Sequence, residues 1–204
     1  MALKFRSLIF IVIFMSSAMA NAGTQDRSPM ETLKEPIDQI ISILNDDTYK
    51  GTAKKDAQRN KIWQIARPVF NFDEISRRAI GKPWTRFSPD EKSRFSAVFS
   101  EFLGSTYIDK LQGEFSNERI DFDKELVKGS KALVRTRLSR QNIEIPIDYR
   151  MHQIDGAWRI YDILVDNGVS LVKNYRVQFT SILKNQTPAQ LIERLEKKLA
   201  DQKK

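Results

Sequence analysis

The chain has 204 residues, no cysteine, one histidine and a formal net charge of +8. These numbers exclude a Cys/His metal cluster, a cysteine nucleophile and a small disulfide-stapled scaffold, and they suit a single domain of ordinary size. Because the basic residues are interspersed with acidic ones, the charge favours a solvated surface over a nucleic-acid-binding one.

The N-terminal segment is typical of an export signal. Two basic residues precede the apolar run of residues 8–15 (LIFIVIFM), and small residues follow. The run is far shorter than the roughly 20 residues of a membrane span, and A-x-A cleavage sites end at Ala20 and at Ala22. We expect 1–22 to be a cleaved signal peptide and 23–204 to be one exported domain, with a retained membrane anchor as the alternative. Export also makes a nucleic acid an unexpected partner.

Three helix starts share the signature of a capping box with proline at the first helical position. They lie at residues 28–31 (SPME), 88–91 (SPDE) and 187–190 (TPAQ). In such a box a hydroxyl accepts from an unpaired backbone amide, and a Glu or Gln side chain reaches back to the capping residue. Apolar residues spaced by three and four follow each box, and those behind the second box form an aromatic stripe from Phe95 to Tyr107. The pattern predicts three amphipathic helices.

Two further helices are expected between the first two boxes. Residues 52–70 have a helical apolar period, but Pro68 predicts a kink or break. Residues 72–80 (FDEISRRAI) predict a short helix that ends at Gly81.

The period then changes from helical to two. Residues 132–139 and 143–152 alternate apolar and polar side chains, Asp155-Gly156 is a hairpin signal that leads into 158–165, and a weaker strand precedes them at 119–124. We predict a four-stranded antiparallel sheet with one face covered. With a mostly helical N-terminal half and C-terminal helices, the fold class is α+β.

The stretch DILVDNGVSLVKNYRVQF (162–179) begins as a strand and ends as a helix. Its Asp166-Asn167-Gly168 turn fits a hairpin by the usual rule. The helical spacing that continues from Val172 for several turns favours a strand-to-helix corner instead, and this is the expectation we adopt.

Few residues have the setting of a catalytic group. His152 is on the polar face of its strand, where a histidine is usually solvated. Asp162 lies beside Tyr161 at the apolar corner, where it would be an acid–base residue or, as we prefer, a structural hydrogen-bond acceptor. We expect no catalytic residue, no metal and no enzyme. The alternatives are a small enzyme that uses Asp162 and Tyr161, and a chaperone-like interaction subunit without a small ligand.

Two stretches of the chain resemble the MlaC family, also called the toluene-tolerance auxiliary family of ABC transporters. Residues 70–111 contain FNFDE, then RRAIG, then a tryptophan before the SPDE cap. Residues 158–183 contain WRIYD and, after the corner, GVSLVKNYRVQF. Each piece is short, but their order and spacing together are specific, and the resemblance covers nearly all of 23–204.

The resemblance implies both a fold and a task. The fold would be a curved four-stranded antiparallel sheet covered by helices, related to the NTF2/cystatin-like class. The task would be to carry a phospholipid across the periplasm of a Gram-negative cell, between an outer-membrane lipoprotein/porin complex and an inner-membrane ABC transporter complex, which maintains outer-membrane lipid asymmetry. The carrier would be a monomer whose only bound group is its cargo. A related branch of the family lies beside hopanoid biosynthesis, so a hopanoid-related lipid is the alternative cargo.

A carrier of this kind holds acyl chains in a pocket between sheet and helices. The wall must be apolar because an unpaired polar group there costs several kcal/mol, whereas each buried CH₂ contributes about 0.8 kcal/mol. The corner at Gly168 would place neighbouring strand and helix residues around one cavity, and the sequence leaves open which of them contact lipid and which are plain core. The expected lining residues are Phe99, Leu103, Tyr107, Val134, Ile145, Ile147, Tyr149, Ile163, Val165, Val169, Leu171, Val172 and Tyr175.

Overall fold

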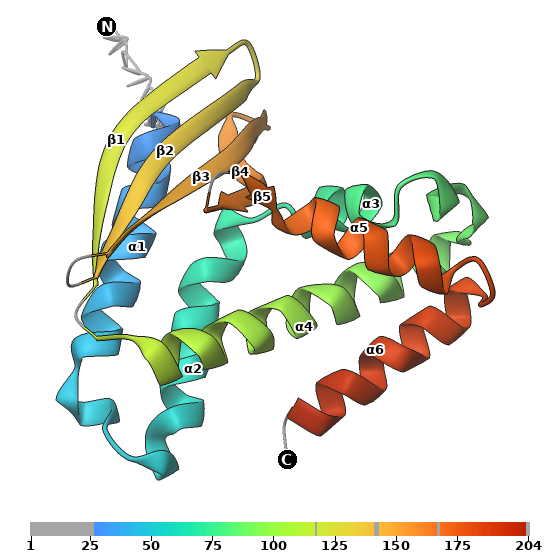
Figure 1. Cartoon of the computed structure of the whole chain (residues 1–204), viewed down its shortest axis with the longest axis horizontal. Helices are drawn as coiled ribbons and strands as arrows, with labels where there is room; N and C mark the ends of the chain where they lie inside the picture. Colours follow the sequence, from blue (N-terminus) through green and yellow to red (C-terminus); the bar gives the residue numbers. More distant parts are fainter. Residues whose placement is uncertain (1–26, 117, 141–142, 167, 203–204) are drawn as a thin grey trace, which may run out of the picture.

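A computed structural model describes residues 27–202 except 117, 141–142 and 167 (Figure 1). The expected signal peptide, 1–22, lies outside the described residues. The α-helices are α1 (Pro29–Asn45), α2 (Lys55–Ala66), α3 (Phe72–Ile80), α4 (Pro89–Glu114), α5 (Leu171–Ile182) and α6 (Pro188–Gln202). Short 3₁₀ turns are η1 (Asp47–Tyr49), η2 (Thr52–Lys54), η3 (Arg67–Val69) and η4 (Lys82–Arg86). The strands are β1 (Arg119–Lys128), β2 (Lys131–Arg140), β3 (Ile143–Ile154), β4 (Ala157–Val165) and β5 (Val169–Ser170).

The three capping boxes are confirmed. At the start of α1, Glu31 N–H donates to Ser28 Oγ (3.2 Å) and Ser28 N–H donates to the Glu31 carboxylate (2.9 Å). Ser88 and Glu91 repeat the reciprocal pair at α4, and the threonine and glutamine of the third box repeat it at α6. Two orphan amides are satisfied at each helix start, so the local sequence sets where these helices begin.

The expected breaks in the helical half are also confirmed. α2 ends at Ala66, ahead of Pro68, and the chain continues as the 3₁₀ turn η3. α3 ends at Ile80 because Gly81 has φ +70°, a left-handed conformation that favours glycine.

The sheet is antiparallel throughout, in the order β1-β2-β3-β4-β5, and the α+β prediction is confirmed. The predicted strand count of four missed β5, in which Val169 pairs with Val165 and Ser170 with Leu164. A strand of two residues is too short to show a period of two, which is why the sequence pattern did not reveal it. The β3–β4 hairpin turns at Asp155-Gly156, as expected.

One face of the sheet, the inner face, packs on α1. Leu33 is the buried apolar anchor of this helix, and Met30 and Ile37 pack beside it. They contact strand residues that alternate toward the same side, and we call the buried set the sheet cluster. Its members are Leu33, Ala132, Val134, Met151, Trp158 and Ile160.

A β-bulge in β1 determines which side chain meets the start of α1. The strand holds one extra residue, Asp123, relative to β2. The extra residue shifts the alternation by one, so Glu125 and not Lys124 faces inward. The Glu125 carboxylate accepts the Met30 N–H at 2.9 Å, where the unpaired amides of a helix start favour a negative group.

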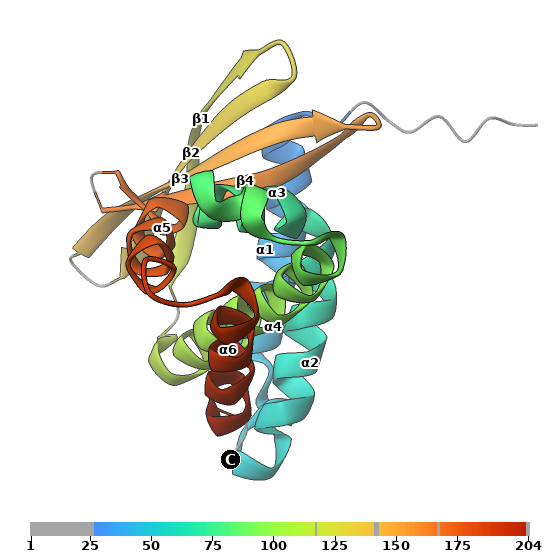
Figure 2. The same ribbon diagram turned by 90° about the vertical axis from the view of Figure 1, so that its right-hand side faces the viewer.

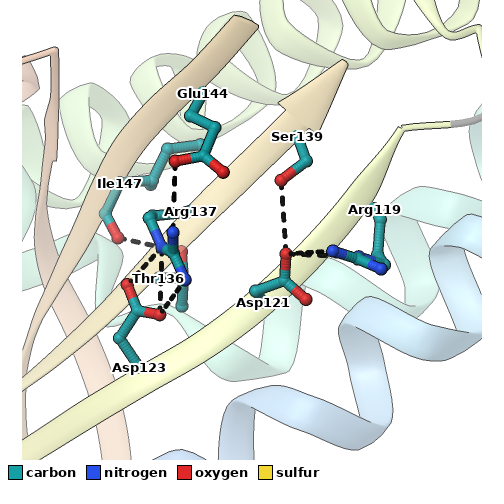
Figure 3. A network of polar contacts seen from close by, with 8 residues as sticks. All are labelled: Arg119, Asp121, Asp123, Thr136, Arg137, Ser139, Glu144 and Ile147. Atoms are coloured by element: carbon teal, nitrogen blue, oxygen red, sulfur yellow. Dashed lines mark hydrogen bonds and ion pairs between the residues drawn. The ribbon is translucent and has the colours of Figure 1, made fainter. Parts of the chain in front are cut away.

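The opposite, outer face carries paired charges (Figure 3). Arg137 donates to Asp123 at 2.9 Å and to Glu144 at 3.1 Å. Asp121 accepts from Arg119 at 3.0 Å and from Ser139 at 3.2 Å. A face of ion pairs is unsuited to an acyl chain, which leaves the inner face as the apolar side of the sheet.

A second core, the helical cluster, lies beside the sheet among α3, α4, α5 and α6 (Figure 2). Phe95, Phe99 and Phe179 pack edge-to-face or tilted, with ring centroids 5.2 to 5.6 Å apart. Phe70 packs against both clusters and so joins them. The buried members of the helical cluster are Ile75, Ala79, Ile80, Phe87, Phe95, Phe99, Leu103, Val172, Tyr175, Phe179, Leu183, Leu191, Ile192 and Leu195.

Among the described residues, no helix has both the length and the apolar composition that crossing a bilayer requires.

Candidate functional site

The strand register brings the expected sheet residues onto one face. Val134 lies opposite Tyr149, and Tyr149 lies opposite Ile163 on the next strand. Ile147 lies opposite Val165 in the same way. Directly paired residues of antiparallel strands point to the same side, so these side chains, together with Ile145, share the inner face.

Burial decreases along the inner face. Val134 is fully buried in the sheet cluster, with Tyr149 and Ile163 packed against it. Farther along, Val165 is 39% exposed and its β5 partner Val169 is 62% exposed. The apolar side of the sheet is therefore covered by α1 around Val134 and less covered toward β5, and Val127 beside the β1–β2 turn is also 54% exposed. We call the less covered part the open strip, which consists of Leu138, Ile145, Ile147, Val165 and Val169.

The polar groups on the inner face are satisfied. The hydroxyl of Thr136, which is 1% exposed, donates to the Ile147 carbonyl at 2.9 Å. Tyr149 is half-buried as a whole, but desolvation of its hydroxyl raises the pKa of Tyr149 to about 12, and a hydrogen bond to Thr136 acts in the opposite direction. A wall without unpaired polar atoms suits a purely apolar ligand.

The expected helix residues lie in or against the helical cluster. Phe99, Leu103, Val172 and Tyr175 are buried members, and Leu171 packs against the cluster half-buried. These side chains pack in the helical cluster, so the predicted lining residues fall into two groups, one on the sheet and one among the helices. Whether lipid contacts either group stays a prediction.

Tyr107 marks the edge of the helical cluster. It is 39% exposed and shares a side-chain hydrogen bond with the buried Tyr175. Desolvation raises the pKa of both phenols, and for Tyr175 the neighbouring Tyr107 adds to the shift. Both groups are therefore neutral at ordinary pH, and the pair adds no charge at this edge.

Asp162 has the structural role that we preferred for it. It is 5% exposed, and its carboxylate accepts from Ser170 Oγ at 2.8 Å and from the Val172 N–H at 3.1 Å. The Arg150 guanidinium forms an ion pair with the same carboxylate at 3.2 Å. Ser170 Oγ in turn accepts the Lys173 N–H at 3.0 Å as the N-cap of α5. The carboxylate thus fixes the strand-to-helix corner that the sequence predicted.

The corner itself combines both interpretations of its sequence. Gly168 has φ +96° and Asp166 has φ +45°, and the chain makes a brief hairpin through β5 before α5 begins at Leu171. The helix expected after the turn is confirmed, and the hairpin that the turn residues suggested is also present.

His152 is less solvated than its position on the polar face suggested. It is half-buried, its Nε2 lies 3.0 Å from Asn71 Nδ2, and its ring contacts Tyr161. Desolvation holds the pKa of His152 below its ordinary value, while Glu74 acts in the opposite direction. The side chain ties the start of α3 to the sheet.

Two open pockets in the described part of the chain are lined by other residues. One, of about 670 Å³, lies between the β3–β4 hairpin, the start of α3 and α4, and includes Ser96 and Arg159. The other, of about 320 Å³, lies between α2 and α4 beside Trp63 and Gly104. Within the described ranges, no group of three or more His, Cys, Asp or Glu side chains could hold a metal ion.

The sequence profile of the MlaC protein family matches residues 34–197. The chain belongs to the MlaC family. A solved structure of the phospholipid-binding protein from Ralstonia solanacearum, in complex with a phospholipid, matches it with a TM-score of 0.71 and 22% identity, over 85% of this chain and 97% of that chain. At this identity the likeness shows that the two share a fold. Comparison with curated proteins gave no match.

Membership of the MlaC family confirms the resemblance that residues 70–111 and 158–183 carried. Within this MlaC-family chain, sequence reasoning missed Leu138, although its strand alternation placed it on the apolar side. It also missed the polar pocket at Ser96, because that pocket is assembled from four separate elements and has no local sequence signal.

Proposed function

We propose that the protein is a periplasmic phospholipid carrier that holds acyl chains against the inner face of its sheet. In this proposal residues 1–22 direct export, and 23–204 act as a monomeric lipid-binding domain. The carrier exchanges lipid between an outer-membrane lipoprotein/porin complex and an inner-membrane ABC transporter complex, and so helps to maintain outer-membrane lipid asymmetry.

The observation that carries the proposal is the open strip. Its apolar side chains continue a fully buried apolar face, yet Val165 and Val169 remain 39% and 62% exposed. Apolar side chains that stay accessible beside a buried core commonly mark a binding surface. The part of the outer face around Arg137 carries ion pairs instead.

Two further findings support a lipid as the ligand. The chain belongs to the MlaC family, and a protein with the same fold was solved in complex with a phospholipid. The inner face also meets the chemical requirement of acyl chains, since the buried hydroxyl of Thr136 already has a partner.

The test is organic extraction of the purified protein followed by mass spectrometry. We expect phospholipid at about one molecule per protein, because burial of two acyl chains at about 0.8 kcal/mol per CH₂ retains lipid through purification. A hopanoid-type lipid in the extract would correct the cargo. A protein that is consistently empty, and that takes up no phospholipid from vesicles, would overturn the carrier proposal in favour of an interaction subunit.

A further inference from the structure

The pocket between the β3–β4 hairpin and α4 is polar and separate from the open strip. Its volume is about 670 Å³. α4 contributes small side chains at helical spacing, whereas η3, the start of α3 and the hairpin contribute charged and aromatic ones. Its lining residues are Arg67, Phe70, Asn71, Phe72, Asp73, Ser93, Ser96, Ala97, Ser100, Ile154, Asp155, Ala157 and Arg159.

Two serines in this pocket differ in their hydrogen bonding. Ser100 is 3% exposed and its hydroxyl donates to the Ala97 carbonyl at 2.8 Å. Ser96 is 7% exposed, and its hydroxyl has no hydrogen-bond partner among the described residues. The Ser96 oxygen is not one of the fully buried unpaired atoms of the described residues, so it remains accessible from the pocket, where its proton can be donated to a ligand.

Cationic and anionic side chains lie together around this donor. Arg67 is exposed and makes no ion pair with any described carboxylate, and Arg159 uses one N–H for the Trp158 carbonyl at 3.1 Å. Asp73 and Asp155 are exposed and pair with no described lysine or arginine. The walls therefore offer guanidinium and hydroxyl donors for an oxyanion and carboxylates for an ammonium.

We propose that this pocket binds a zwitterionic phosphate ester of the phosphoethanolamine type. Arg67, Arg159 and the Ser96 hydroxyl contact the phosphate, and the carboxylates of Asp73 and Asp155 contact the ammonium. The ligand is either a small soluble ester or the headgroup of a bound lipid. Only the second source rests on the proposed carrier function.

The pocket borders the apolar interior at the hairpin end of β3, whereas Ile145 and Ile147 of the open strip lie at the other end of that strand, so the acyl chains of a lipid held here would enter beside Phe70. Phe70 lines the pocket and packs against both the sheet cluster and the helical cluster. It is also held in place, because it forms a β-bridge with Ile160 and the next residue, Asn71, donates its N–H to the Ile160 carbonyl at 2.9 Å. The backbone at this edge of the pocket is therefore fixed against β4, which suits a site that must recognise a small polar group.

The experiment is a titration of isotope-labelled protein, freed of lipid, with O-phosphoethanolamine, followed by NMR. We expect amide shifts at Ser96, Phe72 and Ala157. Ser96→Ala should weaken binding by about tenfold because it removes a hydrogen bond to a charged group. Ser100→Ala is the matched control and should change the affinity less than about twofold, since its proton is already committed to Ala97. Arg67→Gln should also weaken binding about tenfold, whereas Arg135→Gln on the outer face should not.

The arms of the titration separate the outcomes. Glycerol 3-phosphate lacks the ammonium and should bind more weakly, and equal binding would overturn the role of Asp73 and Asp155. If a lipid headgroup occupies the pocket, O-phosphoethanolamine will shift these amides only after lipid removal. If the source is a soluble ester, lipid-loaded protein will respond equally. The absence of shifts from the lipid-free protein at millimolar ligand, or equal affinity of Ser96→Ala, would overturn the site whether or not the protein carries lipid.

Discussion

The carboxylate of Asp162 accepts the backbone N–H of Val172 at 3.1 Å, and this bond joins β4 to the first turn of α5. The acceptor lies on one side of the corner and the donor on the other. Because the first amides of a helix have no intrahelical partner, the bond satisfies a group that would otherwise be buried and unpaired. Asp162 precedes the turn in sequence and stabilises the helix start that follows the turn.

Removal of this carboxylate should destabilise the fold. We expect Asp162→Ala to lower the free energy of unfolding by about 2–4 kcal/mol, because it leaves the Val172 amide and the Arg150 guanidinium without their acceptor. Asp162→Asn keeps the shape and one acceptor and should cost about half as much. Denaturant unfolding measures both. Asp121→Asn on the outer face is the control, and an equal loss there would contradict a special role for Asp162.

A pair of tryptophan substitutions separates the open strip from the core. Val165 is 39% exposed on the inner face, so the indole of Val165→Trp should occupy space that an acyl chain would fill. We expect a lower lipid content and a nearly unchanged melting temperature of the lipid-free protein. Val172 is 4% exposed, so Val172→Trp should cost about 1–3 kcal/mol through overpacking. Lipid per protein and thermal melting after lipid removal are measured together. Full lipid content in Val165→Trp would remove the open strip from the acyl-chain site.

Close packing of α2 on α4 depends on Gly104. A Cβ at this position would lie 2.8 Å from the ring of Trp63, which donates to Glu101 at 3.2 Å and cannot easily withdraw. Alanine gains about 1 kcal/mol of helix propensity, but overpacking costs about 1–3 kcal/mol, so we expect Gly104→Ala to be destabilised in chemical denaturation. Gly113→Ala in the same helix is the control, because a Cβ there meets nothing within 4 Å and should be neutral or stabilising.

The free energy of unfolding should decrease in alkaline solution because the Tyr149 hydroxyl ionises there. Desolvation raises the pKa of Tyr149 from about 10 to about 12 in the folded protein. As the pH rises above 10, the unfolded chain loses the Tyr149 proton before the folded protein does. The stabilisation by neutral Tyr149 is therefore full below pH 10 and is lost as the pH rises through about 12. Unfolding free energies at about pH 9 and about pH 11 should therefore differ less in Tyr149→Phe than in the parent protein. Tyr49→Phe, outside both clusters, is the control, and an identical pH dependence in Tyr149→Phe and the parent would contradict the prediction.

Export is tested on the cellular protein. The A-x-A sites at Ala20 and Ala22 predict that the periplasmic form begins near Asn21 or Gly23. N-terminal sequencing of the periplasmic fraction checks this. Recovery of the full-length chain in the membrane fraction would show that the apolar run is retained as an anchor.

The sequence was sufficient to predict helix starts and ends, because the residues that form these features are neighbours in the chain. The reciprocal pair of Ser28 and Glu31 and the left-handed Gly81 could be predicted because their partners lie within four residues. The sequence could not predict which apolar residues of the inner face are buried and which remain accessible. Val134 and Val165 have the same place in the strand alternation, and only the position of α1 buries one and leaves the other accessible.

The polar pocket illustrates the same limit. Ser96 and Ser100 are chemically identical and lie on the same helix face, one turn apart. Only the three-dimensional arrangement shows that one hydroxyl has a partner and the other does not. The partner of Ser100 is the Ala97 carbonyl three residues earlier in the same helix, so the two serines differ in side-chain rotamer, which a sequence pattern does not specify.

The bulge at Asp123 has a consequence for how the chain folds. If β1 paired with β2 in unbroken register, Lys124 would replace Glu125 on the inner face and bring an ammonium group to the positive end of α1. A sheet with that error would repel the helix that it must bind. Met30 precedes its carboxylate acceptor by 95 residues, so α1 is synthesised before Glu125. Docking of α1 therefore favours the bulged register of β1, because that register places a carboxylate and not an ammonium at the Met30 amide.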